Sequence, residues 1–305
     1  MLVTLKDILN LCEAKGCAVG SFNTPNLEAI MAVIQAAEEL DVPVIIQHAQ
    51  VHEEIIPLDV IGPVMVEFAK RAKVPVAVHL DHGETIDYIY RALQMGFTGV
   101  MYDGSVLPYE ENLANTQIVV SLAKQTGAAV EAEIGCMGKR ESGSGTGGAD
   151  PSKVYTDPDQ AADFVKRSGV DALACSFGTT HGVYLTKPQL DFSVVENVRK
   201  KANNVPVVMH GGSGVSKEDF QEGIRKGVRR INYYTYMAMA AGHMVESQFR
   251  MGCIPVEKDG KAYKYCYSLV ESKNDAPIMY HDIVKWGTNA MKENCKEAMK
   301  TFSMK

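Results

Sequence analysis

Three histidines lie where short apolar runs of the chain are about to end, and their residue type suits a metal site. They are His82 in VAVHLDHGE, His181 in CSFGTTHGVY and His210 in VVMHGGSG, and Asp81 directly precedes the first. Three neutral imidazoles that converge from separate strands can bind zinc and leave a coordination position for a substrate oxygen. A neighbouring carboxylate can carry the proton when a metal polarises a carbonyl. We therefore expect a metal-dependent enzyme.

A fourth histidine, His79, lies three residues before His82 in the HLDH motif. Side chains alternate in direction along a strand, so the two imidazoles are not expected to bind the same ion. We expect His82 to be the ligand and His79 to support it from beneath by packing or hydrogen bonding. The remaining histidines have no comparable context and are expected on the surface or in packing roles: His48, His52, His243 and His281.

A glycine-rich segment directly after His210 has the composition of a phosphate site. Gly211, Gly212 and Ser213 offer backbone amides and a hydroxyl that no bulky side chain obstructs. The segment RRINYYTYM places Asn232 and Thr235 at the end of the next apolar run. Phosphate sites after the seventh and eighth strands recur in one fold, the (β/α)8 barrel.

The pattern of elements predicts that same fold. Short apolar runs, each read as a strand, alternate with amphipathic stretches of helical length. The predicted strands are Cys17–Phe22, Val42–Gln47, Val74–His79, Gly99–Asp103, Ala128–Glu133, Ala172–Ser176, Val205–His210 and Val228–Asn232. A doubly wound open sheet is the alternative, but it needs a glycine-rich turn after its first strand, where this chain has Asn-Thr-Pro. We predict an α/β TIM barrel whose site lies at the carboxyl ends of the strands, where Asn23, Asp103, Glu133 and Asn232 also fall.

Helices are predicted between the strands and at both ends of the chain. The predicted helices are Leu27–Leu40, Val60–Arg71, Thr85–Met95, Glu110–Thr126, Pro158–Ser168, Val194–Ala202, Lys217–Lys226 and Tyr236–Phe249, with an extra N-terminal helix and a C-terminal helix at Tyr280–Phe302. Two helices are expected to start at capping boxes, Ser193–Glu196 and Ser216–Asp219.

Two segments stand outside the repeat of strands and helices. Gly135–Asp150 is rich in glycine and serine and is expected to be a mobile loop over the mouth of the barrel. Met251–Asp275 is expected to form a hairpin that turns at Asp259–Gly260. We predict one domain over residues 1–305, in which residues 251–305 are an atypical C-terminal extension.

Composition excludes several other classes of protein. The 305 residues carry a net charge of −6, which argues against a nucleic-acid-binding surface. No apolar run approaches the roughly 18 residues of a membrane span, and the N-terminus does not resemble a secretion signal. The 7 cysteines are scattered without a CxxC pair. We expect a reduced, cytoplasmic enzyme that does not act on membranes.

The motifs taken together resemble those of one known family. AVGSFNTPNLEAI, HLDHG, DGSVLPYEEN, VEAEIG, DPDQAADFV, FGTTHGVY, HGGSG and IN-x-x-T follow one another over roughly residues 1–245. This order and spacing resembles the class II, zinc-dependent ketose-bisphosphate aldolases, which include the fructose- and tagatose-bisphosphate aldolases. The resemblance implies reversible cleavage of a phosphorylated ketose to dihydroxyacetone phosphate and an aldehyde.

The same resemblance implies a role for each matching residue. One zinc ion on His82, His181 and His210 would stabilise the enediolate, and Asp81 would take the proton from the C4 hydroxyl. Glu141 would handle the proton on the enediolate carbon. Supporting polar positions are His79, Asn23, Asp103, Glu131 and Glu133, and the residues implied to bind the 1-phosphate, with a monovalent cation nearby, are Gly182, Gly211, Gly212, Ser213, Asn232 and Thr235. The implied assembly is a homodimer or a homotetramer.

The chain also departs from the family pattern. Ala49 replaces a serine common in fructose-bisphosphate enzymes, and the segment Asp-Pro-Arg, whose arginine binds the far phosphate in many relatives, is absent. Lys139, Arg140 or Lys187 could substitute for that arginine, which would restore recognition of an ordinary bisphosphate. The expected substrate is therefore a ketose 1-phosphate or a 1,6-bisphosphate. A metal hydrolase and a non-catalytic metal-binding barrel remain as alternatives, and the intact Asp81, glycine-rich segment and histidines favour the aldolase.

Overall fold

Eight parallel strands close into a barrel, as predicted. The computed structural model describes residues 1–135, 155–180, 188–258, 261–272 and 277–304. The strands pair in chain order, and β1 closes the barrel by pairing with β8. They are β1 Val19–Asn23, β2 Val44–Ala49, β3 Val76–Gly83, β4 Gly99–Tyr102, β5 Ala129–Ile134, β6 Ala172–Cys175, β7 Val207–Met209 and β8 Val228–Tyr233.

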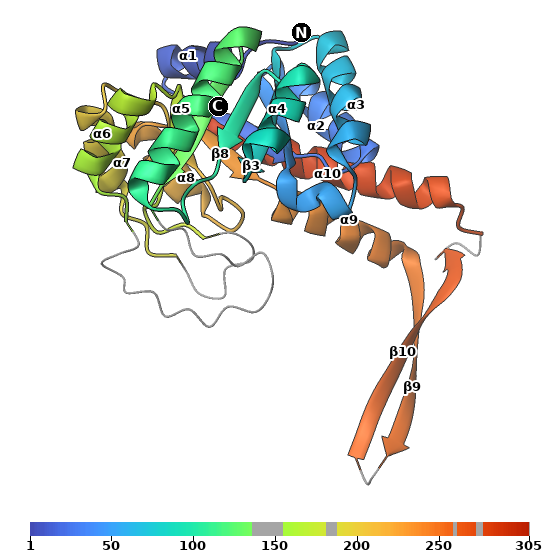
Figure 1. Cartoon of the computed structure of the whole chain (residues 1–305). Helices are drawn as coiled ribbons and strands as arrows, with labels where there is room; N and C mark the ends of the chain where they lie inside the picture. Colours follow the sequence, from blue (N-terminus) through green and yellow to red (C-terminus); the bar gives the residue numbers. More distant parts are fainter. Residues whose placement is uncertain (136–154, 181–187, 259–260, 273–276, 305) are drawn as a thin grey trace.

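Helices surround this barrel and bury the outer face of its strands (Figure 1). The helices are α2 Leu27–Leu40, α3 Leu58–Arg71, α4 Ile86–Gln94, α5 Tyr109–Thr126, α6 Pro158–Ser168, α7 Phe192–Lys201, α8 Lys217–Lys226 and α9 Thr235–Gln248, and a short 3-10 helix, η1, spans Gln50–Glu54. Because both faces of a parallel barrel are covered, its strands can be apolar on both faces, as in β6 and β7, whereas β5 and β8 also carry buried charged residues. The predicted TIM barrel is confirmed. Among the described residues, no helix is long and apolar enough to cross a membrane.

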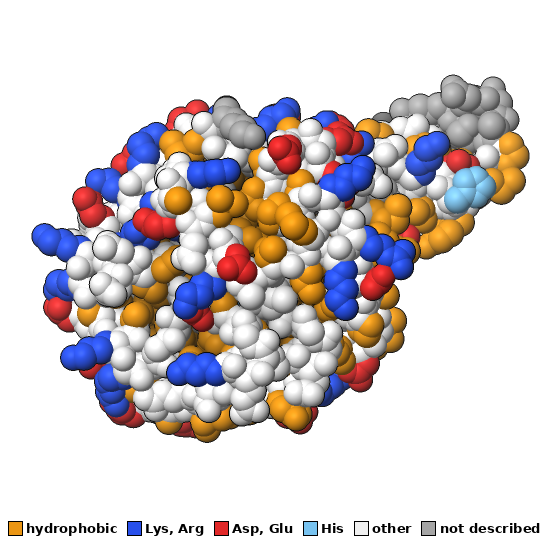
Figure 2. Space-filling model, turned by 90° about the horizontal axis from the view of Figure 1, so that it is seen from above, with side chains coloured by type: hydrophobic (Ala, Val, Ile, Leu, Met, Phe, Trp, Pro, Cys, Tyr) orange, Lys and Arg blue, Asp and Glu red, His pale blue; other side chains and the backbone are white. Residues whose placement is uncertain are grey.

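The N-terminal helix α1, Leu5–Lys15, closes the end of the barrel opposite the site. Its apolar residues recur at helical spacing, at Leu5, Ile8, Leu9 and Cys12, and pack on small and β-branched side chains inside the barrel. Thr4 caps its first turn and Gly16 ends it in the left-handed conformation. Figure 2 views the molecule from the top of Figure 1, where α1 and the N-terminus lie, and shows acidic and basic side chains interspersed around this face.

A long hairpin and a final helix follow the barrel. Strands β9 Phe249–Lys258 and β10 Lys261–Ser272 pair antiparallel and extend away from the barrel (Figure 1), which confirms the predicted hairpin. Its predicted turn at Asp259–Gly260 lies outside the described residues. Helix α10, Tyr280–Phe302, has the predicted bounds and returns to the barrel, where the rings of Phe302 and Phe220 lie 5.0 Å apart.

One of the two predicted capping boxes is wrong. Helix α7 begins one residue before Ser193, because the carboxylate of Asp191 accepts hydrogen bonds from the Ser193 amide at 2.9 Å and from its hydroxyl at 2.6 Å. A carboxylate is a strong cap at the positive end of a helix, and it engages the serine hydroxyl as a donor. At Ser216 the N-cap is confirmed, since its hydroxyl accepts from the Asp219 amide at 3.1 Å. The Asp219 carboxylate accepts from the Ser216 hydroxyl at 2.7 Å and not from the Ser216 amide, so the reciprocal half of the predicted box is not formed.

Candidate active site

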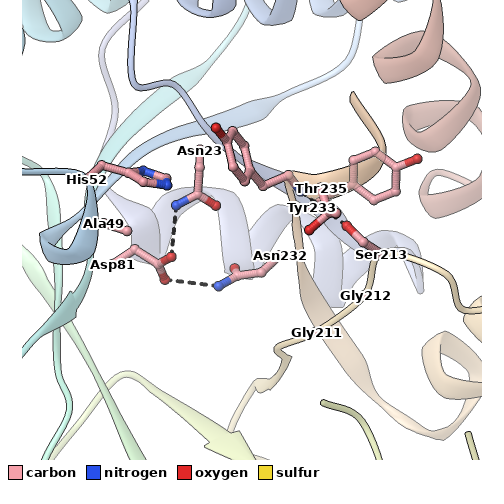
Figure 3. Close-up of a pocket in the computed structure, with 11 residues that line it drawn as sticks. Asn23, Ala49, His52, Asp81, Gly211, Gly212, Ser213, Asn232, Tyr233 and Thr235 are labelled. Carbon is pink, nitrogen blue, oxygen red and sulfur yellow. Dashed lines mark hydrogen bonds between the residues drawn. The ribbon is translucent and has the colours of Figure 1, made fainter. Parts of the chain in front are cut away.

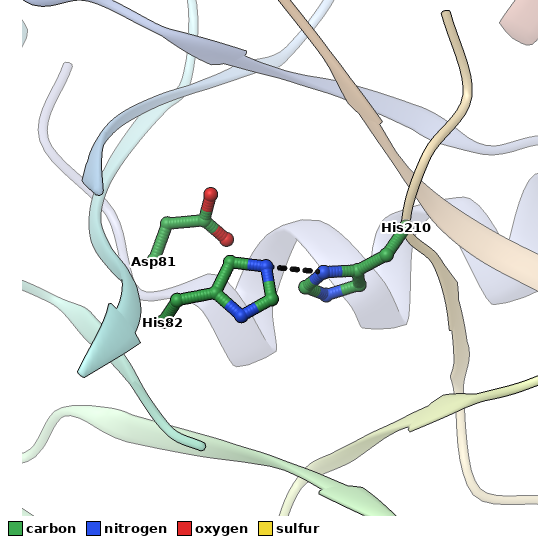
Figure 4. Close-up of side chains that lie close together, drawn as sticks. All are labelled: Asp81, His82 and His210. Atoms are coloured by element: carbon green, nitrogen blue, oxygen red, sulfur yellow. Dashed lines mark hydrogen bonds between the residues drawn. The ribbon is translucent and has the colours of Figure 1, made fainter. Parts of the chain in front are cut away.

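A bulge at the end of β3 turns two neighbouring side chains towards the same space. The register of β3 against β4 shifts between Leu80 and Gly83. At this point His82 has φ 47°, in the left-handed region that residues other than glycine rarely adopt. Regular strand geometry would direct Asp81 and His82 to opposite faces. With the bulge, both are directed towards His210, which follows β7 (Figure 4).

His82 and His210 face each other through one ring nitrogen each. His82 Nε2 and His210 Nδ1 lie 2.9 Å apart. The other ring nitrogens contact carboxylates, His82 Nδ1 to Asp103 at 2.8 Å and His210 Nε2 to Glu131 at 2.9 Å. Such carboxylate partners orient a metal-binding histidine and fix which nitrogen carries its proton. The two facing nitrogens are therefore the ones directed away from these carboxylates.

The surroundings of this histidine pair are buried and rich in carboxylates. Burial and, after it, the nearby His82 lower the pKa of His210 to about 3. Burial also opposes protonation of His82, but Asp81, Asp103 and Glu133 outweigh it and raise its pKa to about 10. The donor atoms form two overlapping groups, each within 4.8 Å: Asp81, His82 and His210, and His82, Asp103 and Glu133. A positive charge is thus favoured at His82.

Asp81 is held by three amide side chains. Its Oδ2 accepts hydrogen bonds from Asn23 at 3.1 Å and from Gln47 at 3.0 Å, and its Oδ1 accepts one from Asn232 at 2.9 Å. Burial alone would raise the pKa of Asp81, but the surrounding His82, His210, Arg230 and His79 outweigh it and lower the pKa below its usual range. The carboxylate is therefore ionised and fixed in orientation.

A polar layer inside the barrel lies beneath the site, and its central residue, Arg230, has no predicted role. Arg230 is fully buried and is ion-paired with Glu131. It also bonds His79 Nε2 at 3.0 Å and Gln47 Oε1 at 2.5 Å. His79 thus belongs to this layer through its hydrogen bond to Arg230. Strand alternation offered a signal for Arg230, since it lies two residues before Asn232 and so shares its face of β8.

The glycine-rich segment after β7 packs tightly against neighbouring backbone. Gly211 has φ +64°, and a Cβ on it would lie 2.3 Å from the carbonyl oxygen of Thr180. A Cβ on Gly212 would lie 2.7 Å from the carbonyl oxygen of Asn232. Only glycine fits such approaches without displacing the backbone. Figure 3 shows this segment along one side of a pocket, with Asp81 across from it.

The pocket brings together most of the predicted phosphate-binding residues with Asp81. Its lining residues are Asn23, Ala49, His52, Asp81, Gly211, Gly212, Ser213, Asn232, Tyr233, Tyr234 and Thr235. His181, Gly182 and Glu141 lie outside the described residues, as do Lys139, Arg140 and Lys187 and all of the predicted mobile loop except Gly135. Thr180, which precedes His181, is described and lies against Gly211.

The four remaining histidines differ in their surroundings. His48 is buried, and His243 and His281 are exposed, as expected. His52 is also buried, which fits a packing role, but it additionally lines the pocket beside Asp81. The sequence offers no signal for this placement, because His52 lies in the short helix η1 after β2 and not at a strand end.

Comparisons with known proteins agree with one another. The family model described as "Fructose-bisphosphate aldolase class-II" matches residues 3–305. The chain is 36% identical over 269 residues to a probable fructose-bisphosphate aldolase of Bacillus subtilis, covering 86% of this chain and 90% of the relative. The crystal structure of the YdjI aldolase from Escherichia coli K12 superposes with a TM-score of 0.81 at 33% identity, covering 99% of this chain and 97% of that one. A putative fructose-1,6-bisphosphate aldolase from Coccidioides immitis gives a TM-score of 0.79 at 26% identity, covering 98% and 95% of the two chains.

Proposed function

Because the chain belongs to the class II fructose-bisphosphate aldolase family and is an aldehyde-lyase, we propose that it reversibly cleaves a phosphorylated ketose to dihydroxyacetone phosphate and an aldehyde. The observation that carries this proposal is the position of Asp81. Its carboxylate is fixed by three amides beside the facing histidines, and the pocket places it across from the glycine-rich segment. A base, a cation site and a phosphate cradle are thus within reach of one small molecule.

The metal of this family is proposed to be one zinc ion per chain, held by His82 Nε2, His210 Nδ1 and His181. The described donor set fits zinc, because two imidazole nitrogens face each other at 2.9 Å and each ring is backed by a carboxylate. Asp103 and Glu133 lie near His82 and offer further oxygen donors. Lewis-acid stabilisation of the negative charge that develops on the substrate is the chemistry that bound zinc would supply.

Asp81 is proposed to take the proton from the C4 hydroxyl as the C3–C4 bond breaks, and to return it in condensation. The three amides orient its lone pairs, and its ionised state keeps it ready to accept the proton. Glu141 is proposed to deliver the proton to the enediolate carbon.

The 1-phosphate is proposed to bind at Gly182, Gly211, Gly212, Ser213, Asn232 and Thr235, with a monovalent cation beside it. Backbone amides in a glycine segment that lines a pocket suit phosphate oxygens. The described pocket lining contains no lysine or arginine. A second phosphate would therefore need Lys139, Arg140 or Lys187. The described lining favours a ketose 1-phosphate over a 1,6-bisphosphate.

The test is to assay metal-analysed protein with fructose and tagatose 1-phosphates and 1,6-bisphosphates, with and without EDTA. Dihydroxyacetone phosphate release is followed by coupled reduction. We expect chelator-sensitive release, a loss of about 100-fold or more in kcat for Asp81→Asn, and unchanged kcat for the exposed control Asp87→Asn. One zinc per chain without release from any of the ketoses would instead favour a non-catalytic barrel or a hydrolase.

We also propose that the protein assembles as a homodimer or homotetramer. The hairpin of β9 and β10 extends away from its own barrel (Figure 1), and a two-stranded ribbon alone is marginally stable in water. A second copy would give it a surface to pack on. Light scattering of the full chain and of a chain with residues 251–272 replaced by a short glycine linker tests this: the full chain should be larger than a monomer and the shortened one should dissociate.

A further inference from the structure

The pocket has an end whose role is not assigned by the proposed chemistry. In Figure 3, His52 and Ala49 lie on the side of Asp81 away from Gly211, Gly212 and Ser213. The proposed function puts the phosphate on C1 at those glycines and the C4 hydroxyl at Asp81. The rest of the ketose, which leaves as the aldehyde, must then extend past Asp81 towards His52.

His52 has an unused polar atom at this end. The residue is only 8% exposed, and its Nδ1 is sealed from solvent without a hydrogen-bond partner among the described residues. Its Nε2 is not sealed in this way and makes no hydrogen bond to the described residues either. Its ring packs on the ring of Tyr234, with centroids 5.0 Å apart. A hydroxyl of a ligand in the pocket would therefore bond Nε2, which no described protein group engages.

The helix η1 that carries His52 is fixed by its own contacts. Glu53 accepts hydrogen bonds from the Leu58 amide at 2.8 Å and from the Tyr88 hydroxyl at 2.5 Å. Gln50 accepts one from the Glu84 amide at 2.8 Å, which joins η1 to the residue after β3. His52 therefore keeps its position before substrate binds, as a residue that selects substrate must.

The side chains at the His52 end of the pocket favour an uncharged ligand group. Burial lowers the pKa of His52, and although Asp81 opposes this in part, the imidazole is neutral at pH 7. Ala49 contributes only a methyl group, and the described lining offers no cation. A phosphate or carboxylate here would meet no counter-charge and would lie near the ionised Asp81. A hydroxyl can bond a neutral imidazole as donor or acceptor.

We propose that His52 is a specificity residue that hydrogen-bonds a hydroxyl of the aldehyde half, and that this half is an uncharged, hydroxylated chain. This inference rests on the proposed aldolase function and adds the class of its second product. It predicts that the enzyme distinguishes aldehydes by their hydroxyl groups.

The experiment uses the condensation direction, with dihydroxyacetone phosphate and one of three aldehydes: glyceraldehyde, propionaldehyde or glyceraldehyde 3-phosphate. Propionaldehyde has the same three carbons without the hydroxyls. For His52→Ala, we expect kcat/KM for glyceraldehyde to fall about 10-fold or more, because a site built for a hydroxyl loses its partner. The value for propionaldehyde should change less than about 3-fold by the same reasoning. His52→Gln should restore part of the glyceraldehyde activity, and the exposed control His243→Ala should change none.

Each outcome separates the hypotheses. An equal loss with glyceraldehyde and propionaldehyde in both His52 variants would show that the residue only supports the fold, and would overturn the proposal. A preference for glyceraldehyde 3-phosphate that survives His52→Ala would overturn the assignment of an uncharged aldehyde. No condensation by the wild type with any aldehyde would refute the proposed function itself. Thermal unfolding of each variant identifies a loss that comes from misfolding.

Discussion

Replacing Arg230 with methionine tests the polar layer beneath the site. The Arg230 and Glu131 side chains are both fully buried, and the guanidinium also bonds Gln47 and His79. Methionine is of similar length but removes the charge, so Glu131 would stay buried without its cation. Breaking a buried ion pair from one side destabilises a protein by about 3–5 kcal/mol. At about 2 °C per kcal/mol for a chain of this length, Tm should fall by about 6–10 °C.

The same reasoning predicts that a second substitution recovers part of the loss. Glu131→Gln in the Arg230→Met background removes the uncompensated charge while keeping an amide near His210 Nε2. The double variant should therefore be more stable than Arg230→Met alone, which is the mark of a coupled pair. As a control, Arg225→Met removes an exposed pair with Glu222 and should change stability by at most about 1 kcal/mol.

The measurement is urea unfolding of the metal-free protein, with EDTA present so that zinc binding does not contribute. The reasoning is refuted if the free energy of unfolding of Arg230→Met is within 1 kcal/mol of the wild-type value. It is also refuted if the effects of the two substitutions on that free energy are simply additive. A second readout connects the layer to the site: Arg230→Met should also lower zinc affinity, because Glu131 then loses the contact that fixes it against His210.

Three further predictions concern single residues. Asp103→Asn should weaken zinc binding about 10–100-fold in chelator competition, because the partner of His82 Nδ1 loses its charge; unchanged affinity would contradict this. Gly211→Ala should raise KM for the phosphorylated ketose and lower Tm, since its Cβ would lie 2.3 Å from the Thr180 carbonyl oxygen; a wild-type KM would count against the phosphate site. Burial lowers the pKa of His48 from 6.5 to about 4. As the pH falls from 6.5 to about 4, this imidazole is therefore protonated in the unfolded chain but stays neutral in the folded chain. The wild type should lose about 3 kcal/mol over this range through His48, and His48→Gln should show a shallower decline of Tm.

Sequence analysis could identify those site residues that lie in short local motifs. Asp81 and His82 are neighbours in one motif, and His210 lies beside its glycine-rich segment. The alternation of short, mostly apolar runs with amphipathic stretches predicted the barrel, because the strands of a parallel barrel are buried on both faces. In a parallel barrel the carboxyl ends of all strands meet at one rim, so strand-end residues could be grouped without knowing which strands are neighbours.

Other features were decided only by the tertiary structure. Sequence alternation directs Asp81 and His82 to opposite faces, and only the bulge with φ 47° at His82 brings them together. A buried arginine is stable only beside a counter-charge, and the partner of Arg230 comes from β5, 99 residues away. His52 enters the pocket because η1 is tied to Tyr88 and Glu84.

The sequence by itself thus determined where strands and helices alternate along the chain, where each strand ends and which residue types lie at those ends. These features depend on neighbours along the chain. The tertiary structure alone decided which charge compensates which, which backbone is bent to bring Asp81 beside His82, and which histidine completes the pocket. The physical reason is that packing contacts and electrostatic interactions depend on distance in space and not on distance along the chain. Closure of the barrel brings together residues that are far apart in the sequence.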